Sequence, residues 1–235
     1  MKKLCIIPAR GGSKRLPGKN IKSLNGKPLI FHTIDAVLKS NLFDKIIFSS
    51  DEDEIIAIVR AGYNQTNLEI DKRPTNLASD TSKVIDTVMY YYYRDVFDTL
   101  DGSNKYNQVW LTLPTCPLRT ALDICNAHKL LTQKINSVVS ITDVEFPPTL
   151  SLNKNSNGQI SSWQPSKPWE KGDSRSQDHP LLYRPNGAVY GAWSEKLEIF
   201  KNFYTPNTQG YYMPRSRSVD IDTEFDFKLA SELLT

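Results

Sequence analysis

The chain has 235 residues, with 29 basic and 26 acidic side chains and a formal net charge of +3. This small positive excess favours an anionic small substrate over nucleic acid. Its three cysteines have no Cys-x-x-Cys spacing, which argues against a disulfide framework and a zinc site, and no apolar run approaches the length of a membrane span. We therefore expect a cytoplasmic protein without a membrane partner, forming one domain over residues 1–235.

Strand patterns alternate with helix patterns along most of the chain. Apolar, β-branched runs predict strands at 4–7, 45–49, 108–113, 137–141 and 187–193. Amphipathic segments predict helices at 29–39, 52–60, 82–96, 121–131 and 224–234. The alternation predicts an α/β fold with a Rossmann-like, mostly parallel sheet flanked by helices, and with ligand-binding loops at the carboxyl edge of the strands.

The alternating pattern breaks at about residues 145–179. This stretch is rich in Pro, Ser, Asn and Lys, and it shows neither helical nor strand periodicity. The residues alone predict a polar, irregular excursion inserted into the domain.

Residues 6–20 read Ile-Ile-Pro-Ala-Arg-Gly-Gly-Ser-Lys-Arg-Leu-Pro-Gly-Lys-Asn and follow directly on the first predicted strand. Adjacent glycines allow a tight turn with exposed amides, and four cations lie within ten residues of each other. This pattern at the end of a first strand favours a phosphate site over a basic solvated loop. A Walker loop is excluded, because five residues separate Gly12 from Gly18 and Asn20 follows Lys19 where that loop needs a hydroxyl.

Asp220 and Asp222 are two residues apart in a segment predicted to be extended. Side chains at this spacing share one face of an extended chain, so the two carboxylates are candidates to hold Mg²⁺ against a substrate phosphate. The alternative is a helix-capping pair, since the helix predicted at 224–234 begins just after them.

Four segments, in order along the chain, resemble the motifs of the sugar cytidylyltransferases, above all the CMP-sialic acid synthetases (acylneuraminate cytidylyltransferases). They are residues 8–20, 73–81, 183–188 and 218–223. The resemblance implies a magnesium-dependent nucleotidyltransferase with two substrates, CTP and a nine-carbon keto-sugar acid. The anomeric hydroxyl of the sugar would attack the α-phosphorus of CTP, and pyrophosphate would leave.

The resemblance also implies roles for individual residues. Arg10 and Lys19 would bind the triphosphate and stabilise the charge that builds on the pyrophosphate. The remaining contacts to CTP would come from Ala9, Gly11, Ser13, Asn20, Arg73, Ser79, Thr81 and Asn186. Within that set, the 73–81 segment would read cytosine, and Asn186 would contact the ribose. Two candidates remain for the base that deprotonates the sugar hydroxyl, Asp222 and a metal-bound hydroxide.

The sugar site departs from the family pattern. Arg184 and Arg175 are candidate sugar contacts, but Leu113 stands where the family has a sugar-binding glutamine, and an apolar residue near Leu150 replaces a family lysine. A leucine cannot hydrogen-bond a hydroxyl or an N-acyl group, and it favours contact with a methyl group. We therefore expect a deoxygenated, diacetamido nonulosonic acid of the legionaminic or pseudaminic type.

The resemblance identifies the insertion at 145–179 as a dimerisation arm that reaches toward the partner's active site, so a homodimer is expected. Two alternatives remain open at this point. One is a CMP-Kdo synthetase, which shares the Pro-Ala-Arg and Leu-Pro-Gly-Lys elements. The other is a nucleotide-binding regulator without catalysis, against which Lys19, Asp220 and Asp222 argue.

Overall fold

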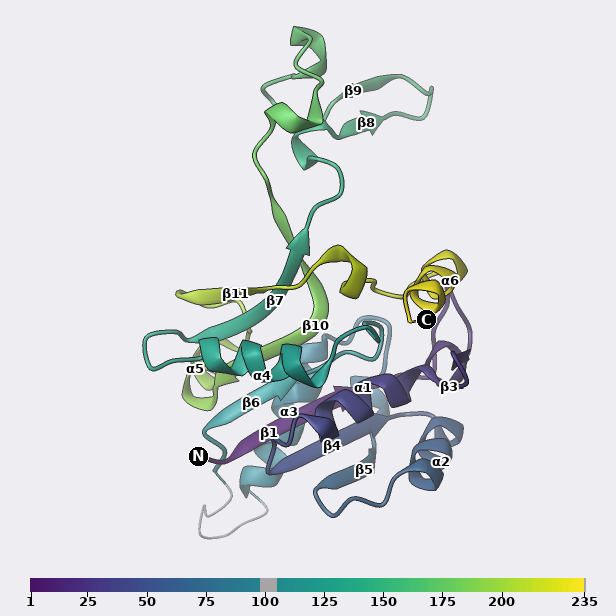
Figure 1. Cartoon of the computed structure of the whole chain (residues 1–235), viewed down its shortest axis with the longest axis vertical. Helices are drawn as coiled ribbons and strands as arrows, with labels where there is room; N and C mark the ends of the chain where they lie inside the picture. The colour runs from purple at the N-terminus through teal and green to yellow at the C-terminus, as the bar shows by residue number, and fades with distance from the viewer. Residues whose placement is uncertain (98–104, 235) are drawn as a thin grey trace.

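Seven strands form one central sheet in the computed structural model, which describes residues 1–97 and 105–234. In the order in which they pair, the strands are β11 (Thr208–Tyr212), β7 (Ser137–Asp143), β10 (Tyr183–Trp193), β6 (Gln108–Leu111), β1 (Lys3–Pro8), β4 (Lys45–Ser50) and β5 (Leu68–Lys72). β10 runs antiparallel to β6 and β7, and the other pairings are parallel (Figure 1). The predicted mostly parallel sheet is confirmed.

Helices cover both faces of the sheet (Figure 1). The helices α1 (Leu29–Lys39), α2 (Asp53–Gly62) and α4 (Ala121–Leu130) bury apolar side chains in one cluster with Cys5 and Ile7 of β1. The helices α3 (Val84–Phe97) and α5 (Ser194–Phe200) do so in a second cluster with Leu4 and Ile6. Successive residues of β1 thus face opposite helical layers, as a strand buried on both sides requires.

The last helix, α6 (Glu224–Leu233), lies apart from these two layers. It packs on a third apolar cluster that includes Leu16 and Leu118, residues of the loops that follow β1 and β6. The C-terminal segment is thereby fastened beside the first loop of the fold. A two-stranded hairpin, β2 (Ser23–Leu24) with β3 (Lys27–Pro28), connects that loop to α1.

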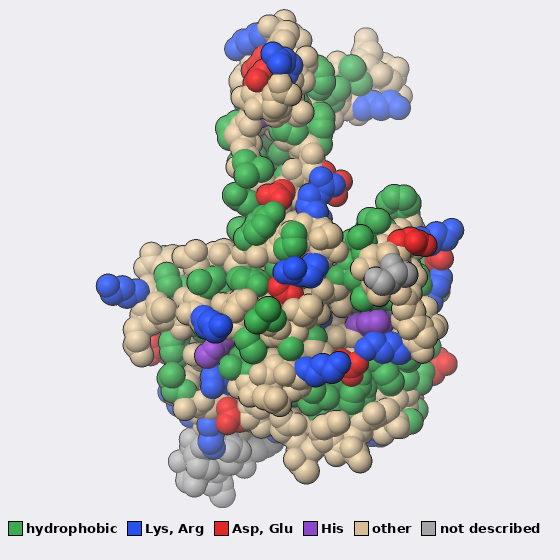
Figure 2. Space-filling view, viewed as in Figure 1, with side chains coloured by type: hydrophobic (Ala, Val, Ile, Leu, Met, Phe, Trp, Pro, Cys, Tyr) green, Lys and Arg blue, Asp and Glu red, His purple; other side chains and the backbone are tan. Residues whose placement is uncertain are grey.

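The insertion is a folded arm between the paired ends of β7 and β10 (Figure 1). It contains a hairpin, β8 (Leu152–Lys154) with β9 (Ile160–Ser162), and three single 3₁₀ turns at Pro148–Leu150, Trp169–Lys171 and Ser176–Asp178. Leu150 is 1% exposed, and its carbonyl accepts a hydrogen bond of 2.7 Å from the Trp169 indole. The arm projects well away from the sheet, and apolar side chains are visible mainly along its part nearer the body, whereas its outer end is mostly polar (Figure 2).

The predicted elements agree with the structure to within a few residues, and one of the differences affects the site. The strand predicted at 108–113 ends at Leu111, so Leu113 lies on the loop that follows β6. Two strands of the central sheet, β5 and β11, and the helix α5 were not predicted, and neither were the short hairpin strands β2, β3, β8 and β9. None of the helices in residues 1–97 and 105–234 combines the length and the apolar character that a bilayer crossing needs.

Candidate active site

The loop after β1 is held against the loop after β4. The amide of Gly11 donates a hydrogen bond of 3.1 Å to Asp51, and a Cβ at position 11 would lie 2.8 Å from the Cβ of Glu52. Only glycine permits so close an approach. The buried Asn20 then closes the loop, because its side-chain amide donates 2.9 Å to the carbonyl of Arg10.

Each of the four cations of this loop pairs with one of two carboxylates. The nitrogen–oxygen distances are 3.2 Å for Arg10–Asp80, 2.6 Å for Lys14–Asp80, 2.7 Å for Arg15–Asp222 and 3.3 Å for Lys19–Asp222. Asp80 belongs to the second motif and Asp222 to the fourth. The cations therefore draw three motifs, far apart in the sequence, around one loop.

Lys19 differs from the other three cations in being buried, at 8% exposure. Its ammonium donates 2.6 Å to the carbonyl of Ile221 and lies 3.3 Å from Asp222. A buried ammonium with few protein acceptors presents a strong local positive charge to any ligand in the loop. This is the arrangement expected of a group that stabilises negative charge.

Three adjoining cavities surround the loop. The first, the loop cavity, measures about 440 Å³ and is lined by Pro8, Arg10, Ser13, Lys14, Arg15, Leu16, Lys19, Asn20, Leu113, Pro114, Thr115 and Asp222. On one side it shares Pro8, Arg10 and Leu113 with the second, the arginine cavity, which measures about 280 Å³ and also contains Arg73 and Ser79.

On the other side the loop cavity shares Arg15 and Asp222 with the third, the acidic cavity, of about 710 Å³. The acidic cavity is also lined by Asp220 and Arg184, and by apolar side chains of α6. The three cavities thus form a row in which the cationic loop is the middle member.

Asp220 and Asp222 both line the acidic cavity, as their spacing predicts. Surrounding protein atoms desolvate Asp220 and raise its pKa above the ordinary value although part of the residue faces solvent, and the charge of Asp222 raises it further. A hydrogen bond with Thr115 and the charges of Lys19 and Arg184 act in the opposite direction. Over the described part of the chain, no three His, Cys, Asp or Glu side chains group closely enough to hold a metal by themselves.

The predicted base-reading segment lies at the arginine cavity. Arg73 is 6% exposed, and its Nε and Nη2 donate 3.0 Å and 2.8 Å to the hydroxyl and carbonyl of Ser49. Ser79 and Thr81 hydrogen-bond each other at 3.2 Å on the exposed loop above it. Arg73 and Ser79 are therefore brought to one cavity with Arg10.

Asn186, the predicted ribose contact, lies in the interior rather than on the surface of a cavity. It is fully buried, its carbonyl oxygen accepts bonds from Ser140 (2.6 Å) and the Ala188 amide (3.1 Å), and its amide donates 2.8 Å to Ser218. The ribose contact stays a prediction, and it requires one of these bonds to be exchanged. The bonds also hold Gly187, whose φ of 77° lies in the left-handed region that favours glycine.

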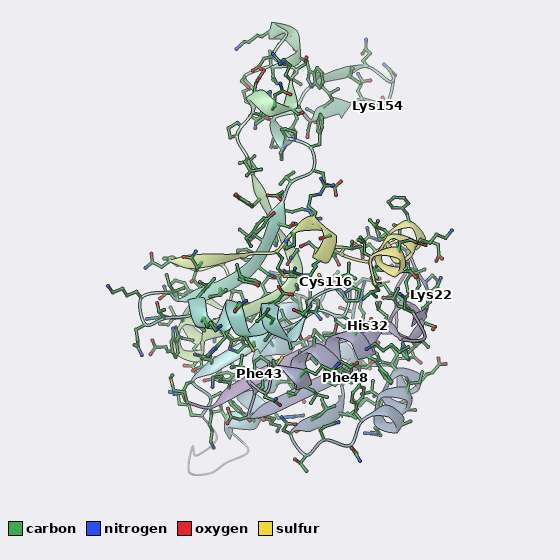
Figure 3. The ribbon with its side chains drawn as sticks, in the orientation of Figure 1. Lys22, His32, Phe43, Phe48, Cys116 and Lys154 are labelled. Carbon is green, nitrogen blue, oxygen red and sulfur yellow. The ribbon has the colours of Figure 1, made fainter. Side chains whose placement is uncertain are left out.

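The sugar candidates are divided between two regions. Leu113 lines both the loop and the arginine cavities, and Arg184 lines the acidic cavity. Arg175 lies in the arm, 71% exposed and 3.7 Å from Asp178. Leu150 is buried within the arm and lines none of the three cavities, so it does not support the inference about the sugar. In Figure 3 Lys154, in the hairpin of the arm, lies far from Cys116, on the loop that also carries Leu113.

Two residues of the site were not predicted from the sequence. Asp80 pairs with two cations of the loop, and Arg119, 3% exposed, donates to the carbonyls of Leu113 and Ala188 and at 2.6 Å to Thr33. Asp80 stands inside the second motif, so its position was a usable signal. The contacts of Arg119 could not be predicted from the sequence, because its partners are brought to it only by the fold.

Comparison with known proteins agrees with this geometry. A family model described as cytidylyltransferase matches residues 4–96. A CMP-N,N'-diacetyllegionaminic acid synthase from Legionella pneumophila is 34% identical over 100% of this chain and 97% of its own length. A pseudaminic acid cytidylyltransferase from Campylobacter jejuni is 34% identical over 99% of this chain and 96% of its own length.

An N-acylneuraminate cytidylyltransferase from Streptococcus agalactiae is also 34% identical over 97% of this chain, which spans only 52% of that relative's length. Among solved structures, a CMP:2-keto-3-deoxy-manno-octonic acid synthetase complexed with CTP superposes with a TM-score of 0.67 at 15% identity, covering 100% of this chain and 98% of its own. That likeness shows the fold alone. The full-length relatives at 34% identity show that the chain belongs to the cytidylyltransferase family.

Proposed function

We propose that the protein transfers CMP from CTP to the anomeric hydroxyl of a nonulosonic acid and releases pyrophosphate. The observation that carries this proposal is the row of three cavities, with the cationic loop between Arg73 on one side and Asp220 and Arg184 on the other. The row offers a place for a base beside Arg73 and for a triphosphate at the cationic loop. The sugar candidates Leu113 and Arg184 line the loop cavity and the adjoining acidic cavity, respectively. The relatives named as CMP-sugar synthases support the same assignment.

In the proposed reaction the anomeric oxygen forms a bond to the α-phosphorus, and the bond from that phosphorus to the bridging oxygen of pyrophosphate breaks. The proton of the sugar hydroxyl passes to a general base, for which Asp222 is the candidate in this chain. Lys19 and Arg10 neutralise the negative charge that builds on the leaving pyrophosphate. Catalysis then rests on positioning and on charge stabilisation rather than on a covalent enzyme intermediate.

The donor set at Asp220 and Asp222 fits Mg²⁺. Two carboxylates without His or Cys supply the hard oxygen ligands that this ion prefers, and it completes its shell with water and phosphate oxygens. When bound there, the ion would supply positive charge to the phosphates. Asp220 and Asp222 would hold it, and the fastening of Asp222 to Lys19 would fix its place relative to the loop.

The sugar is proposed to be a diacetamido nonulosonic acid of the legionaminic or pseudaminic type. Leu113 faces two of the cavities, and full-length relatives are named for sugars of this class. The test is kcat/KM for N,N'-diacetyllegionaminic, pseudaminic and N-acetylneuraminic acids, in the wild type and in Leu113→Gln. We expect the wild type to prefer one of the diacetamido sugars and the variant to lose part of that preference. A clear wild-type preference for N-acetylneuraminic acid that L113Q leaves unchanged would refute the inference.

The arm is proposed to pair with a second subunit. Its exposed Trp163, Ile160 and Leu181 are 55%, 65% and 64% accessible, and their burial against a partner would stabilise a dimer. Arg175 would then reach the sugar carboxylate in the partner's site, which explains its distance from the cavities of its own chain. The alternative of a CMP-Kdo synthetase rests on the shared Pro-Ala-Arg and Leu-Pro-Gly-Lys elements and on a likeness of fold at 15% identity. A substrate panel that includes Kdo separates the two activities.

A further inference from the structure

Arg73 is anchored by a chain of hydrogen-bonded side chains that belongs to neither the loop nor the substrate cavities. Its Nε donates 3.0 Å to the Ser49 hydroxyl, that hydroxyl donates 2.9 Å to the Tyr91 hydroxyl, and Tyr91 donates 2.8 Å to a carboxylate oxygen of Asp71. Ser49 and Tyr91 are fully buried. The proton directions follow from the ends of the chain, because a guanidinium can only donate and a carboxylate can only accept.

Each end of this chain is secured. The Asp71 carboxylate lies 3.2 Å from the guanidinium of Arg94, which also stacks 4.8 Å from the centre of the Tyr91 ring. At the other end the Ser49 carbonyl accepts a bond of 2.8 Å from Arg73 Nη2 and another of 2.8 Å from the Ala9 amide. Arg73 is thereby fixed relative to the first residue of the cationic loop as well as to β4.

The anchoring leaves one nitrogen of the Arg73 guanidinium, Nη1, for a ligand. The two bonds to Ser49 use Nε and Nη2, and within the described residues Nη1 makes no hydrogen bond. Arg73 also lines the arginine cavity, with Arg10 and Ser79. A guanidinium held at two of its nitrogens presents the third in one direction only.

We propose that Ser49, Tyr91 and Asp71 are positioning residues that hold Arg73 rigid and thereby set the preference for cytosine over uracil, an inference that rests on the proposed use of CTP. Cytosine presents acceptors at O2 and N3, whereas N3 of uracil carries a hydrogen and donates. A rigid donor that faces N3 forms a hydrogen bond with cytosine. In uracil the same donor faces the N3–H group, and a site with two opposed donors binds that base much more weakly. A mobile donor would turn to an oxygen of either base and would discriminate less.

The chain offers a matched pair of variants for the test. Tyr91 and Tyr92 are adjacent in α3, both are fully buried, and the Tyr92 hydroxyl donates 2.6 Å to Glu198 on the side of α5. Tyr91→Phe and Tyr92→Phe therefore remove the same atom and one bond to a carboxylate at the same depth. Only the first of these bonds leads to Arg73.

The experiment measures Kd for CTP and for UTP by titration calorimetry with Mg²⁺, together with KM and kcat for CTP, below the melting temperature of every variant. Tyr91→Phe should lower the CTP-over-UTP preference by roughly tenfold and raise KM for CTP, whereas kcat changes little. Tyr92→Phe should keep the wild-type preference. Ser49→Ala should act in the same direction as Tyr91→Phe, and the double variant should add little to Ser49→Ala because both sites belong to one chain of bonds.

The possible failures are distinguishable. A wild type that shows no preference for CTP would refute the proposed use of CTP. A wild type that prefers CTP, with Tyr91→Phe retaining that preference as fully as Tyr92→Phe, would overturn the role of the buried chain and leave the proposed function standing.

Discussion

Lys19 joins the two ends of the molecule at the site. It lies on the first loop of the fold, and its ammonium is bound by the carbonyl of Ile221 and the carboxylate of Asp222 near the C-terminus. Its burial removes competing water, so its charge acts on a bound phosphate through a medium of low polarity. Arg10, Lys14 and Arg15 are much more exposed and more strongly screened.

Lys19→Met is expected to lower kcat/KM for CTP by at least about a hundredfold, because it removes a charge aimed at the leaving group. Lys22→Met is the matched control. Lys22 lies on the same segment, but it pairs with Glu224 at 2.6 Å and covers the Phe227 ring at 4.8 Å. Steady-state rates of pyrophosphate release give both values. Equal losses in the two variants would show that the segment needs positive charge in general rather than Lys19 in particular.

Asp220→Asn and Asp222→Asn should each lower turnover by about a hundredfold at ordinary Mg²⁺, because each removes a charged ligand of the proposed ion. Higher Mg²⁺ should recover part of the rate. Glu224→Gln, two residues beyond Asp222 in the first turn of α6, should remain near wild type. If both aspartate variants turn over normally at ordinary Mg²⁺, these residues do not belong to the metal site.

The sequence predicted the residues of the site better than their contacts. Five predicted residues line the cavities, namely Arg10, Lys19, Arg73, Asp220 and Asp222. They could be predicted because each follows a strand or belongs to a short motif. The burial of Asn186 and the role of Arg119 depend on partners from distant segments, and periodicity carries no information about such partners.

At the scale of elements, the strands that were missed are those at the edges of the sheet. β5 reads Leu-Glu-Ile-Asp-Lys and β11 reads Thr-Gln-Gly-Tyr-Tyr, and each pairs on one side only. Charged residues and glycine are common where a strand faces solvent, and they dilute the apolar pattern that identifies central strands. α5, with seven residues, is too short to show helical periodicity clearly.

The arm exposes several large apolar side chains, among them Ile160, Trp163 and Leu181. Trp163→Glu should shift the protein from a dimer toward a monomer, because it places a charge on an apolar surface proposed to be buried. Ile199→Glu in α5, at a residue that is 67% exposed, is the control and should leave assembly unchanged. Light scattering at micromolar concentration should give twice the 26.7 kDa of one chain for the wild type. A wild-type monomer would contradict the proposed role of the arm.

For the whole molecule, two half-buried histidines should make stability depend on pH. Burial lowers the pKa of His32 and of His128 below the ordinary value of 6.5. The unfolded chain therefore binds more protons than the folded one in the window between 6.5 and these lowered values, so stability rises with pH through that window and is lost as pH falls through it. The melting temperature should be lower at pH about 5.5 than at pH about 7.5.

Replacing both residues, in His32→Gln with His128→Gln, should reduce this dependence. His179→Gln, in the arm, is the control for the removal of a histidine elsewhere in the chain. A double variant whose melting temperature falls with pH as steeply as that of the wild type would show that other groups cause the effect.

The reaction proposed for the whole molecule requires that the α-phosphate of CTP ends on the sugar. The direct measurement supplies CTP labelled at the α-phosphate, together with N,N'-diacetyllegionaminic or pseudaminic acid and Mg²⁺, and identifies the labelled product. We predict that the label appears in a CMP-sugar and that the released pyrophosphate is unlabelled, with little product from UTP. Label that remains in CTP with every nonulosonic acid, or label found in free CMP alone, would contradict the account.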